Sequence, residues 1–506
     1  MGGPALAAEW KVIAHHEGPS HVTAMPDSSP TQPAAGLPMA SRWNPEQLRR
    51  EEEQLQRLET QPLTARVRGY LKLTGPAWMQ SAMTLGAGSA VASVVAGASF
   101  GYSLLWVQPV AMLLGIVMMA ALANIVLTTG ERPYPAFARE LHPSIAFLWA
   151  LGSIVASVIW HFPQYGLAGA AIWDLAQLAG VPADSVTAQY LVKFGGGFAI
   201  LGMAITVTWN YGSGARGIKL YETFLRWMIR LVILAFLFVV IKTGVNWGEL
   251  FRGFFQFRMP SGEGSTTLVL GAIGAAVGIN MTFLYPYSLL AKGWGRHHQG
   301  LARFDLVNSM FLPFVIVTSL VIIAMANTVH DPTLGIVRTD LRPVDAARSL
   351  ETLLGSSLGR VILDLGFVGM ACGAISTHMV VCGFTGCEMF KLEYTAARYR
   401  RFTLLPAIGI LGVAFSSPLW MPIVASAIAL TMLPIAYLAF FLLNNKRGYL
   451  GAAVGAGWKR IAFNAAMIVA ILFATIASAI QIKGRVIDKL FPPNKPSATS
   501  VPVPPK

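Results

Sequence analysis

Charged residues are scarce in this chain of 506 residues, because Asp, Glu, Lys and Arg together make up only 12% of it. An average soluble domain carries about 25%. Hydrophobic residues account for 54%, and many apolar runs reach about 18 residues, the length that crosses a bilayer. The polar–apolar alternation of a membrane β-barrel is absent. The composition therefore predicts an all-α polytopic membrane protein.

Cysteine is also rare. Cys372, Cys382 and Cys387 all fall in one apolar segment, and their spacing fits neither a disulfide framework nor a metal site. The HExxH pattern of a zinc hydrolase does not occur in the chain. We therefore expect no enzymatic activity and no cofactor.

Acidic residues are fewer than basic ones, which leaves a formal net charge of +14. The basic residues gather in alternate short loops between apolar runs, such as the loop from Lys292 to Arg303 and the loop from Lys391 to Arg401. This distribution follows the positive-inside rule and predicts a cytoplasmic N-terminus. It argues for the lipid bilayer, and against nucleic acid, as the partner of the basic residues.

The apolar runs divide the chain into segments. We expect a disordered tail over 1–43 without a cleavable signal peptide, then a charged cytoplasmic helix and lead-in over 44–74. A membrane domain follows over 75–483, and a second disordered tail over 484–506. Eleven spans are predicted in the membrane domain, at 76–100, 103–128, 144–175, 191–210, 220–242, 266–291, 304–328, 361–389, 402–416, 418–443 and 459–482.

Glycines interrupt two of these spans at matching positions. The first contains MTLGAGSA over 83–90, and the sixth contains Gly271, Gly274 and Gly278, followed by Pro286. Broken helices at corresponding places in two halves are typical of secondary transporters built from inverted repeats. The alternative is that these glycines only allow neighbouring helices to pack closely.

A family resemblance begins at Gly75-Pro76 and runs without a gap to the turn at Ser99–Tyr102. It returns at 271–277 in the sixth span, and also at 217–222, 371–377 and 421–451. Here the chain resembles the natural resistance-associated macrophage protein (NRAMP) family of proton-coupled divalent-metal transporters, in a divergent bacterial branch. The resemblance implies a LeuT-like fold, with two inverted five-helix repeats (75–242 and 266–443) plus an eleventh helix (459–482). It also implies the bacterial inner membrane.

The chain departs from the family at the metal-binding motifs. The family's Asp-Pro-Gly-Asn falls on Gly86–Ser89, and its Met-Pro-His falls on Gly278–Asn280. The family's ligand positions at Gly86, Ser89 and Gly278 therefore lack the usual side chains, so metal ligands are unknown. The acids that pass protons in the family align near Pro163 and Gly166. The resemblance thus implies the scaffold without the family's metal chemistry.

Polar and glycine positions at membrane depth are the candidate site residues. For substrate binding we predict Gly86, Ala87, Ser89, Ser93, Gly278, Asn280 and Tyr285. His161 and His378 are candidates for proton coupling, because histidine titrates near neutral pH. The alternative for each histidine is a neutral ring bonded to a carbonyl of a neighbouring helix.

The leading hypothesis is a monomeric secondary transporter that works by alternating access, with symport as a possible coupling mode. Its substrate is either a weakly coordinated divalent metal ion or a small organic solute, which half-helix N-termini would hold if it were anionic. The second hypothesis is an NRAMP-like sensor or scaffold without transport activity. Both glycine breaks favour transport, since a scaffold would be more stable with continuous helices.

Overall fold

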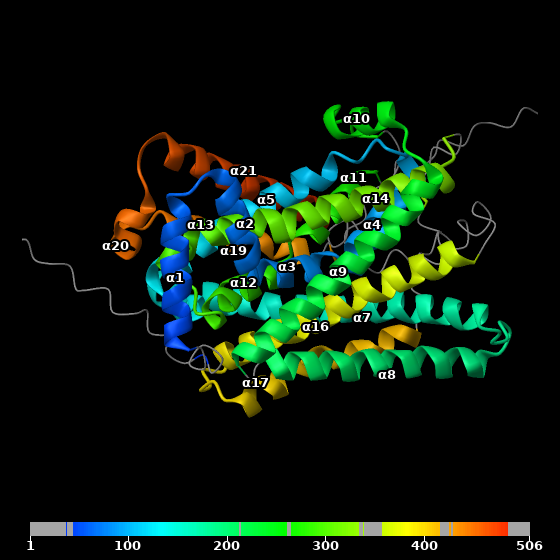
Figure 1. Cartoon of the computed structure of the whole chain (residues 1–506), viewed down its shortest axis with the longest axis horizontal. Coiled ribbons are helices and arrows are strands. Elements are labelled where there is room, and N and C mark those ends of the chain that lie inside the picture. The colour runs from blue at the N-terminus through cyan, green and yellow to red at the C-terminus, as the bar shows by residue number, and fades with distance from the viewer. Residues whose placement is uncertain are drawn as a thin grey trace, which may run out of the picture.

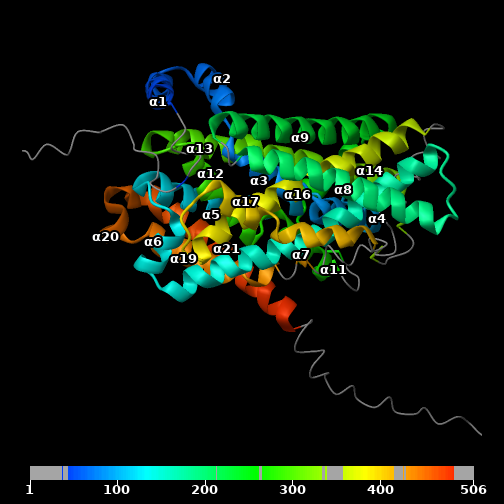
Figure 2. The same ribbon diagram turned by 90° about the horizontal axis from the view of Figure 1, so that it is seen from below.

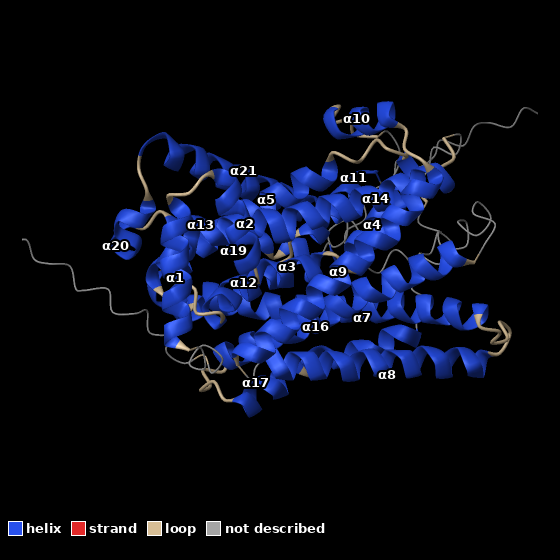
Figure 3. Cartoon of the chain, viewed as in Figure 1, coloured by secondary structure: helices blue, strands red, loops and turns tan. Residues whose placement is uncertain are grey.

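A computed structural model describes residues 44–211, 214–260, 265–332, 337–338, 357–414, 425–426 and 429–483, together with Leu37. The two predicted tails, except Leu37, lie outside these ranges. Helices and the loops between them make up all of the described chain (Figures 1 and 3). The helices of the membrane domain pack side by side in one bundle (Figure 1).

The helical elements follow one another with short connections. In chain order they are α1 (Pro45–Glu59), α2 (Leu63–Leu73), α3 (Pro76–Thr84), α4 (Ala87–Phe100), α5 (Val107–Thr129), α6 (Pro133–Glu140), α7 (Pro143–Leu178), α8 (Val186–Tyr211), α9 (Ala215–Thr243), α10 (Trp247–Phe255), α11 (Ser265–Ala276), α12 (Ile279–Ala291), η2 (Arg296–His298), α13 (Gln299–Leu306), η3 (Val307–Phe311), α14 (Leu312–Thr328), α16 (Leu358–Met389), α17 (Ala396–Thr403), η4 (Leu405–Ala414), α19 (Leu433–Asn444), α20 (Arg447–Leu450), η5 (Gly451–Val454) and α21 (Gly457–Ile482).

Nine of the eleven predicted spans correspond to membrane-length helices or to a bent pair of helices, and the predicted span 418–443 is described only over 425–426 and 429–443. Among the described residues, 8 helices are long and apolar enough to cross a membrane, and up to 10 spans result if each of two bent pairs counts as one. The predicted span 402–416 differs, because η4 is a 3₁₀ helix of 10 residues. At a rise of about 2 Å per residue it covers roughly 20 Å, less than the hydrocarbon core. Residues 415–424, which follow it, lie outside the described part.

The first and sixth spans are both interrupted. α3 and α4 form one of the bent pairs, with 50° between them, and the break consists of Leu85 and Gly86 alone. In the sixth span, Val277 and Gly278 separate α11 from α12. Both breaks therefore occupy two residues and end on a glycine that precedes the second half-helix.

Neither glycine is required by an unusual backbone angle, but Gly86 lies close to a neighbouring helix. Gly86 has φ −112° and Gly278 has φ −96°, which any residue can adopt. A methyl group on Gly86, however, would come within 2.5 Å of the Gln164 side chain in α7. The sequence indicated an open backbone here, and the structure adds that a neighbouring helix fills the place of the missing side chain.

The interrupted helices lie in the interior of the bundle. α16 packs against both α7 and α3, α4 packs against α14, and α12 packs against α5 and α7. Every residue of α12 is buried. The short helices α1 and α2 stand outside the bundle, where α1 contacts η2 and α2 contacts α13 (Figure 2). The fold thus surrounds both breaks with continuous helices and keeps the charged N-terminal helices apart from them.

Candidate functional site

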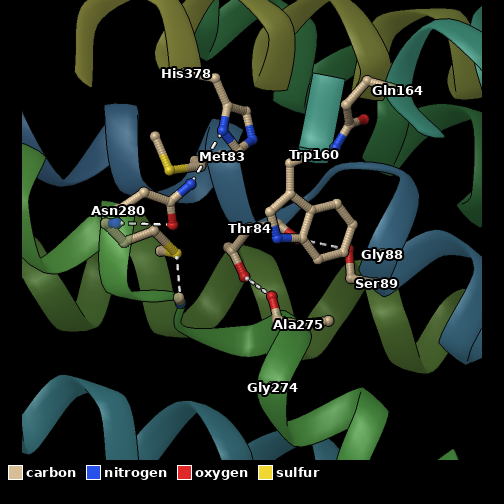
Figure 4. Close-up of a pocket in the computed structure, with 12 residues that line it drawn as sticks. Met83, Thr84, Gly88, Ser89, Trp160, Gln164, Gly274, Ala275, Asn280 and His378 are labelled. Carbon is tan, nitrogen blue, oxygen red and sulfur yellow. Dashed lines mark hydrogen bonds between the residues drawn. The ribbon is translucent and has the colours of Figure 1, made fainter. Parts of the chain in front are cut away.

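A small cavity lies where the two breaks face each other (Figure 4). Its volume of about 20 Å³ gives room for roughly one water molecule. The residues around it come from α3, α4, α7, α11, α12 and α16, with Gly278 from the second break. They are Met83, Thr84, Gly88, Ser89, Trp160, Gln164, Gly274, Ala275, Gly278, Asn280, Met281 and His378.

Two hydroxyl groups connect the ends of the half-helices. Thr84 Oγ1 donates to the carbonyl of Ala276 at 2.6 Å, across to the last turn of α11. Ser89 Oγ donates to the carbonyl of Thr84 at 2.6 Å, across the first break. Because each hydroxyl hydrogen is engaged by a carbonyl, both oxygens keep only lone pairs to offer to a ligand. This arrangement suits a cation or a hydrogen-bond donor.

α7 supports the first break from outside. Gln164 Oε1 accepts a hydrogen bond from the Ala87 backbone N–H at 2.8 Å, and so satisfies one of the unpaired donors at the start of α4. Trp160, one turn earlier, lies over Gly88, where a methyl group would come within 2.3 Å of the indole. Glycine at 88 is therefore required for this ring to close the cavity.

Asn280 and His378 form the polar side of the cavity (Figure 4). Asn280 Oδ1 accepts from the Met281 backbone N–H at 3.1 Å, which directs the amide nitrogen Nδ2 toward His378 Nδ1 at 3.0 Å. Nδ1 must then be the acceptor, so this geometry requires a neutral ring with its hydrogen on Nε2. A proton on Nδ1 would break this bond.

Two thioethers line the cavity, from Met83 just before the first break and Met281 just after the second. The sulfur of Met281 also lies 3.4 Å from the backbone nitrogen of Gly278. No carboxylate is among the lining residues, and the described residues contain no group of three or more His, Cys, Asp or Glu side chains that could hold a metal. The side chains that could act as ligands to a cation thus offer neutral oxygens, an amide and soft sulfur atoms.

The cavity brings together four of the residues predicted from the sequence, namely Ser89, Gly278, Asn280 and His378. Gly86 and Ala87 are at the break but contact Gln164 instead of lining the cavity. The remaining predicted residues, Ser93, Tyr285 and His161, are not part of the lining either.

Those three residues are all buried elsewhere. The Tyr285 hydroxyl is 3.5 Å from the Ala302 carbonyl in α13. His161 lies next to His378, with 5.7 Å between ring centroids. Its Nε2 is 3.1 Å from the Ile375 carbonyl, which is the carbonyl-bonded arrangement named above as the alternative.

Sequence reasoning missed several lining residues, among them Met83, Thr84, Trp160, Gln164 and Met281. The available signal was position: Met83 and Thr84 directly precede the first glycine break, and Met281 follows the second by three residues. Trp160 and Gln164 are four residues apart and so share one face of α7. Only the packing of α7 against the break reveals that this face points to the cavity.

The sequence and the fold both have known relatives. A family model described as "Natural resistance-associated macrophage protein-like" matches residues 77–481. The divalent metal cation transporter MntH of Acidiphilium cryptum is 24% identical over 431 residues, covering 82% of this chain and 92% of that protein. MntH of Deinococcus radiodurans is 27% identical over 404 residues, covering 77% and 85%.

Among solved structures, a manganese transporter from Eremococcus coleocola superposes with a TM-score of 0.64 at 15% identity, covering 85% of this chain and 90% of that one. This similarity confirms the LeuT-like fold that the family resemblance implied. Since the family model spans most of the chain, this protein belongs to the natural resistance-associated macrophage protein-like family, and it is a multi-pass membrane transporter rather than an enzyme.

Proposed function

We propose that this transporter carries a single metal cation through the cavity between the two helix breaks, and that neutral donors hold the ion there. The curated relatives are named as divalent metal cation transporters, which supports a divalent cation as cargo. Alternating access follows from the LeuT-like scaffold, in which the two repeats rock around a central site.

The observation that carries this proposal is the size of the cavity. A volume of about 20 Å³ admits one water molecule or one ion, whereas an amino acid or a carboxylic acid is several times larger. An organic solute would require the Trp160 indole to swing away from Gly88. The small-solute hypothesis from the sequence is therefore the less favoured one, and the experiment below also tests it.

The donor set predicts which cations are preferred. Mg²⁺ and Ca²⁺ bind to several hard oxygens, usually including carboxylates, and no carboxylate lines this cavity. The thioethers of Met83 and Met281 favour softer ions. We expect Cd²⁺ and Mn²⁺ to be carried in preference to Mg²⁺, with Cd²⁺ ahead of Mn²⁺ because it is the softer ion.

Proton coupling is proposed for His378 rather than for His161. The Nδ1 atom of His378 accepts from Asn280 at 3.0 Å, so a proton bound there would displace the Asn280 amide from its position beside the cavity. Cation binding and His378 protonation would then oppose each other. His161 is engaged with a backbone carbonyl and would act only by holding the neighbouring ring in place.

The orientation is part of the proposal as well. The basic loops support a cytoplasmic N-terminus, and the bacterial relatives support the inner membrane of a bacterium. In this orientation α1, α2 and the loop between α16 and α17 lie on the cytoplasmic side.

Uptake into proteoliposomes tests the cargo. Purified protein is reconstituted, and Cd²⁺, Mn²⁺ and Mg²⁺ uptake is measured with and without an inward proton gradient. We expect saturable Cd²⁺ and Mn²⁺ uptake, and at least about a tenfold loss in Met83→Leu and in Met281→Leu, because each removes one sulfur at similar volume. Met118→Leu, a buried methionine of α5 outside the cavity, is the matched control and should transport normally.

Two results would contradict the proposal. One is equal uptake of Mg²⁺ and Cd²⁺ that both thioether variants leave unchanged. The other is uptake of a radiolabelled amino acid or organic acid, with no uptake of any of the three metals, which would favour the organic-solute hypothesis.

A further inference from the structure

A second cavity, of about 570 Å³, lies apart from the helix breaks. It falls in the size range of small-molecule sites, about 300–1,000 Å³. Residues along α6 and at the end of α16 form it, together with the loop that follows α16. Its lining consists of Arg132, Tyr134, Pro135, Ala138, Arg139, Glu388, Lys391, Leu392, Glu393 and Tyr394.

Most charges around this cavity are already paired. Arg132 Nη1 is 3.2 Å from Glu388 Oε1, and the Tyr394 hydroxyl donates to the same oxygen at 3.1 Å. Arg139 is held by Glu131 at 2.7 Å and by Glu140 at 2.9 Å. The carboxylates nearest the cavity are thus largely neutralised.

Lys391 is the exception. Its side chain is exposed, and among the described residues its ammonium group has no ion-pair partner. Glu393, the nearest acid along the chain, faces Arg398 at 3.9 Å. Arg132 also keeps unused donors, because within the described part of the chain only its Nη1 makes a side-chain hydrogen bond, and the guanidinium lies 5.5 Å from the centre of the Tyr394 ring. The cavity therefore presents one unpaired ammonium and a half-used guanidinium.

The backbone at Lys391 is unfavourable for a lysine. Its φ is +50°, one of two positive values at non-glycine residues in the described chain. The Lys391 N–H bonds to the Glu388 carbonyl and the Leu392 N–H to the Cys387 carbonyl, in the helix-ending turn that glycine usually occupies. Lysine costs free energy in this conformation relative to glycine, so the reason for a lysine here lies in its side chain.

We propose that this cavity binds a phosphate-bearing anion, with the Lys391 ammonium and the unused N–H groups of Arg132 as its ligands. The guanidinium offers paired donors that match phosphate oxygens, and the ammonium adds a point charge. Pro135, Ala138 and Leu392 provide an apolar wall for the remainder of the ligand.

Two sources could supply this chemistry. One is the headgroup of an anionic phospholipid, since the cavity lies next to the basic helix α17, whose Arg398, Arg400 and Arg401 would attract such lipids. The other is a soluble phosphate compound from the same side of the membrane. A ligand here would bridge α6 and α16, two elements that belong to different repeats.

Thermal unfolding of the full-length protein in nanodiscs tests the proposal. One arm compares phosphatidylcholine alone with phosphatidylcholine plus phosphatidylglycerol, and the other adds glycerol 3-phosphate to the phosphatidylcholine sample. We expect the Tm of the wild-type protein to rise in at least one arm. The arm in which it rises shows whether the anion comes from a lipid headgroup or from a soluble phosphate compound. Lys391→Arg should keep the rise.

The informative variant is Lys391→Gly. Glycine adopts the positive φ at 391 without strain, so without the anion this variant should unfold at the same Tm as wild type or above it. It should nevertheless bind the anion at least tenfold more weakly. Lys72→Gln, which removes an exposed lysine of α2, is the control for loss of charge. The proposal is overturned if Lys391→Gly keeps the full rise in Tm, or if wild type shows no rise in either arm.

Discussion

At the scale of single residues, the cavity depends on small side chains and uncharged donors. Gly88 lets Trp160 approach the first break, and the hydroxyls of Thr84 and Ser89 point their hydrogens at carbonyls. The family motif places Asp at 86, but a side chain there would meet Gln164 at 2.5 Å. A side chain at 86 would therefore require the Gln164 amide to move away from the Ala87 N–H that it accepts from.

Gly88→Ala tests how closely Trp160 must pack. The added methyl would lie 2.3 Å from the indole, so the ring must move, and we expect at least about a tenfold loss of Cd²⁺ or Mn²⁺ uptake. Gly202→Ala in α8 is the control, because nothing lies within 4 Å of the added methyl. It should transport normally and gain up to about 1 kcal/mol of stability. Normal uptake by Gly88→Ala would mean that Trp160 does not close the cavity.

At the scale of helices, the first half-helix α3 is anchored at its N-terminus by another element. Asp305, at the end of α13, accepts from the Ala77 N–H at 2.9 Å and from the Gly75 N–H at 3.3 Å. Its other oxygen accepts from Ser309 at 2.7 Å. A carboxylate at this place satisfies backbone donors and complements the helix dipole. Because α3 ends at the cavity, its anchoring decides how freely one wall can move.

Asp305→Ala should therefore loosen α3. We expect a loss of about 1–3 kcal/mol in stability, since buried backbone donors lose their acceptor, and faster labelling of a cysteine introduced at Ala77. Chemical unfolding and maleimide labelling measure the two effects. Ser309→Ala removes only the hydrogen bond that orients Asp305 and should cost less. Unchanged labelling in Asp305→Ala would indicate that the packing of α3, rather than this cap, fixes its position.

At the scale of the whole molecule, an N-terminal helix outside the bundle is tied to the membrane domain. Glu51 of α1 lies 3.6 Å from His298 of η2. Burial alone would raise the pKa of Glu51, but the contact with His298 and the charge of Lys292 lower it on balance. A carboxyl whose pKa is lower in the folded state stabilises docking above its unfolded pKa, and that contribution disappears as pH falls through the folded value.

Acidification should therefore release α1. We expect α1 to remain docked at neutral pH and down to about pH 4, near the ordinary glutamate value, and to lose amide-exchange protection, measured relative to the intrinsic rate at each pH, below it. Hydrogen exchange over 45–59 as a function of pH measures this. Glu51→Gln should be less protected from exchange already at neutral pH, and its protection should no longer depend on pH. An identical profile in both proteins would show that apolar contacts alone hold the helix.

Much of the architecture could be predicted from the sequence, because it depends on local properties. Apolar runs of membrane length predict where the spans lie, and Gly86 and Gly278 predict the breaks in the first and sixth spans. The sequence predicts Ser89, Gly278, Asn280 and His378, which line the cavity, because polar or glycine residues stand out at membrane depth. The predicted span 402–416 shows the limit, since a 3₁₀ helix and an α-helix can have the same apolar composition.

The sequence by itself thus determined the membrane-spanning helices and the positions of their breaks, since each depends on residues close together in the chain. Only the tertiary structure decided which side chains meet at the breaks. Met83, Met281, Trp160 and Gln164 belong to three separate spans, and their convergence depends on the 50° bend and on the rotation of α7. Such rotations are set by packing between distant segments, which hydrophobic patterns cannot encode when a helix is apolar on every side.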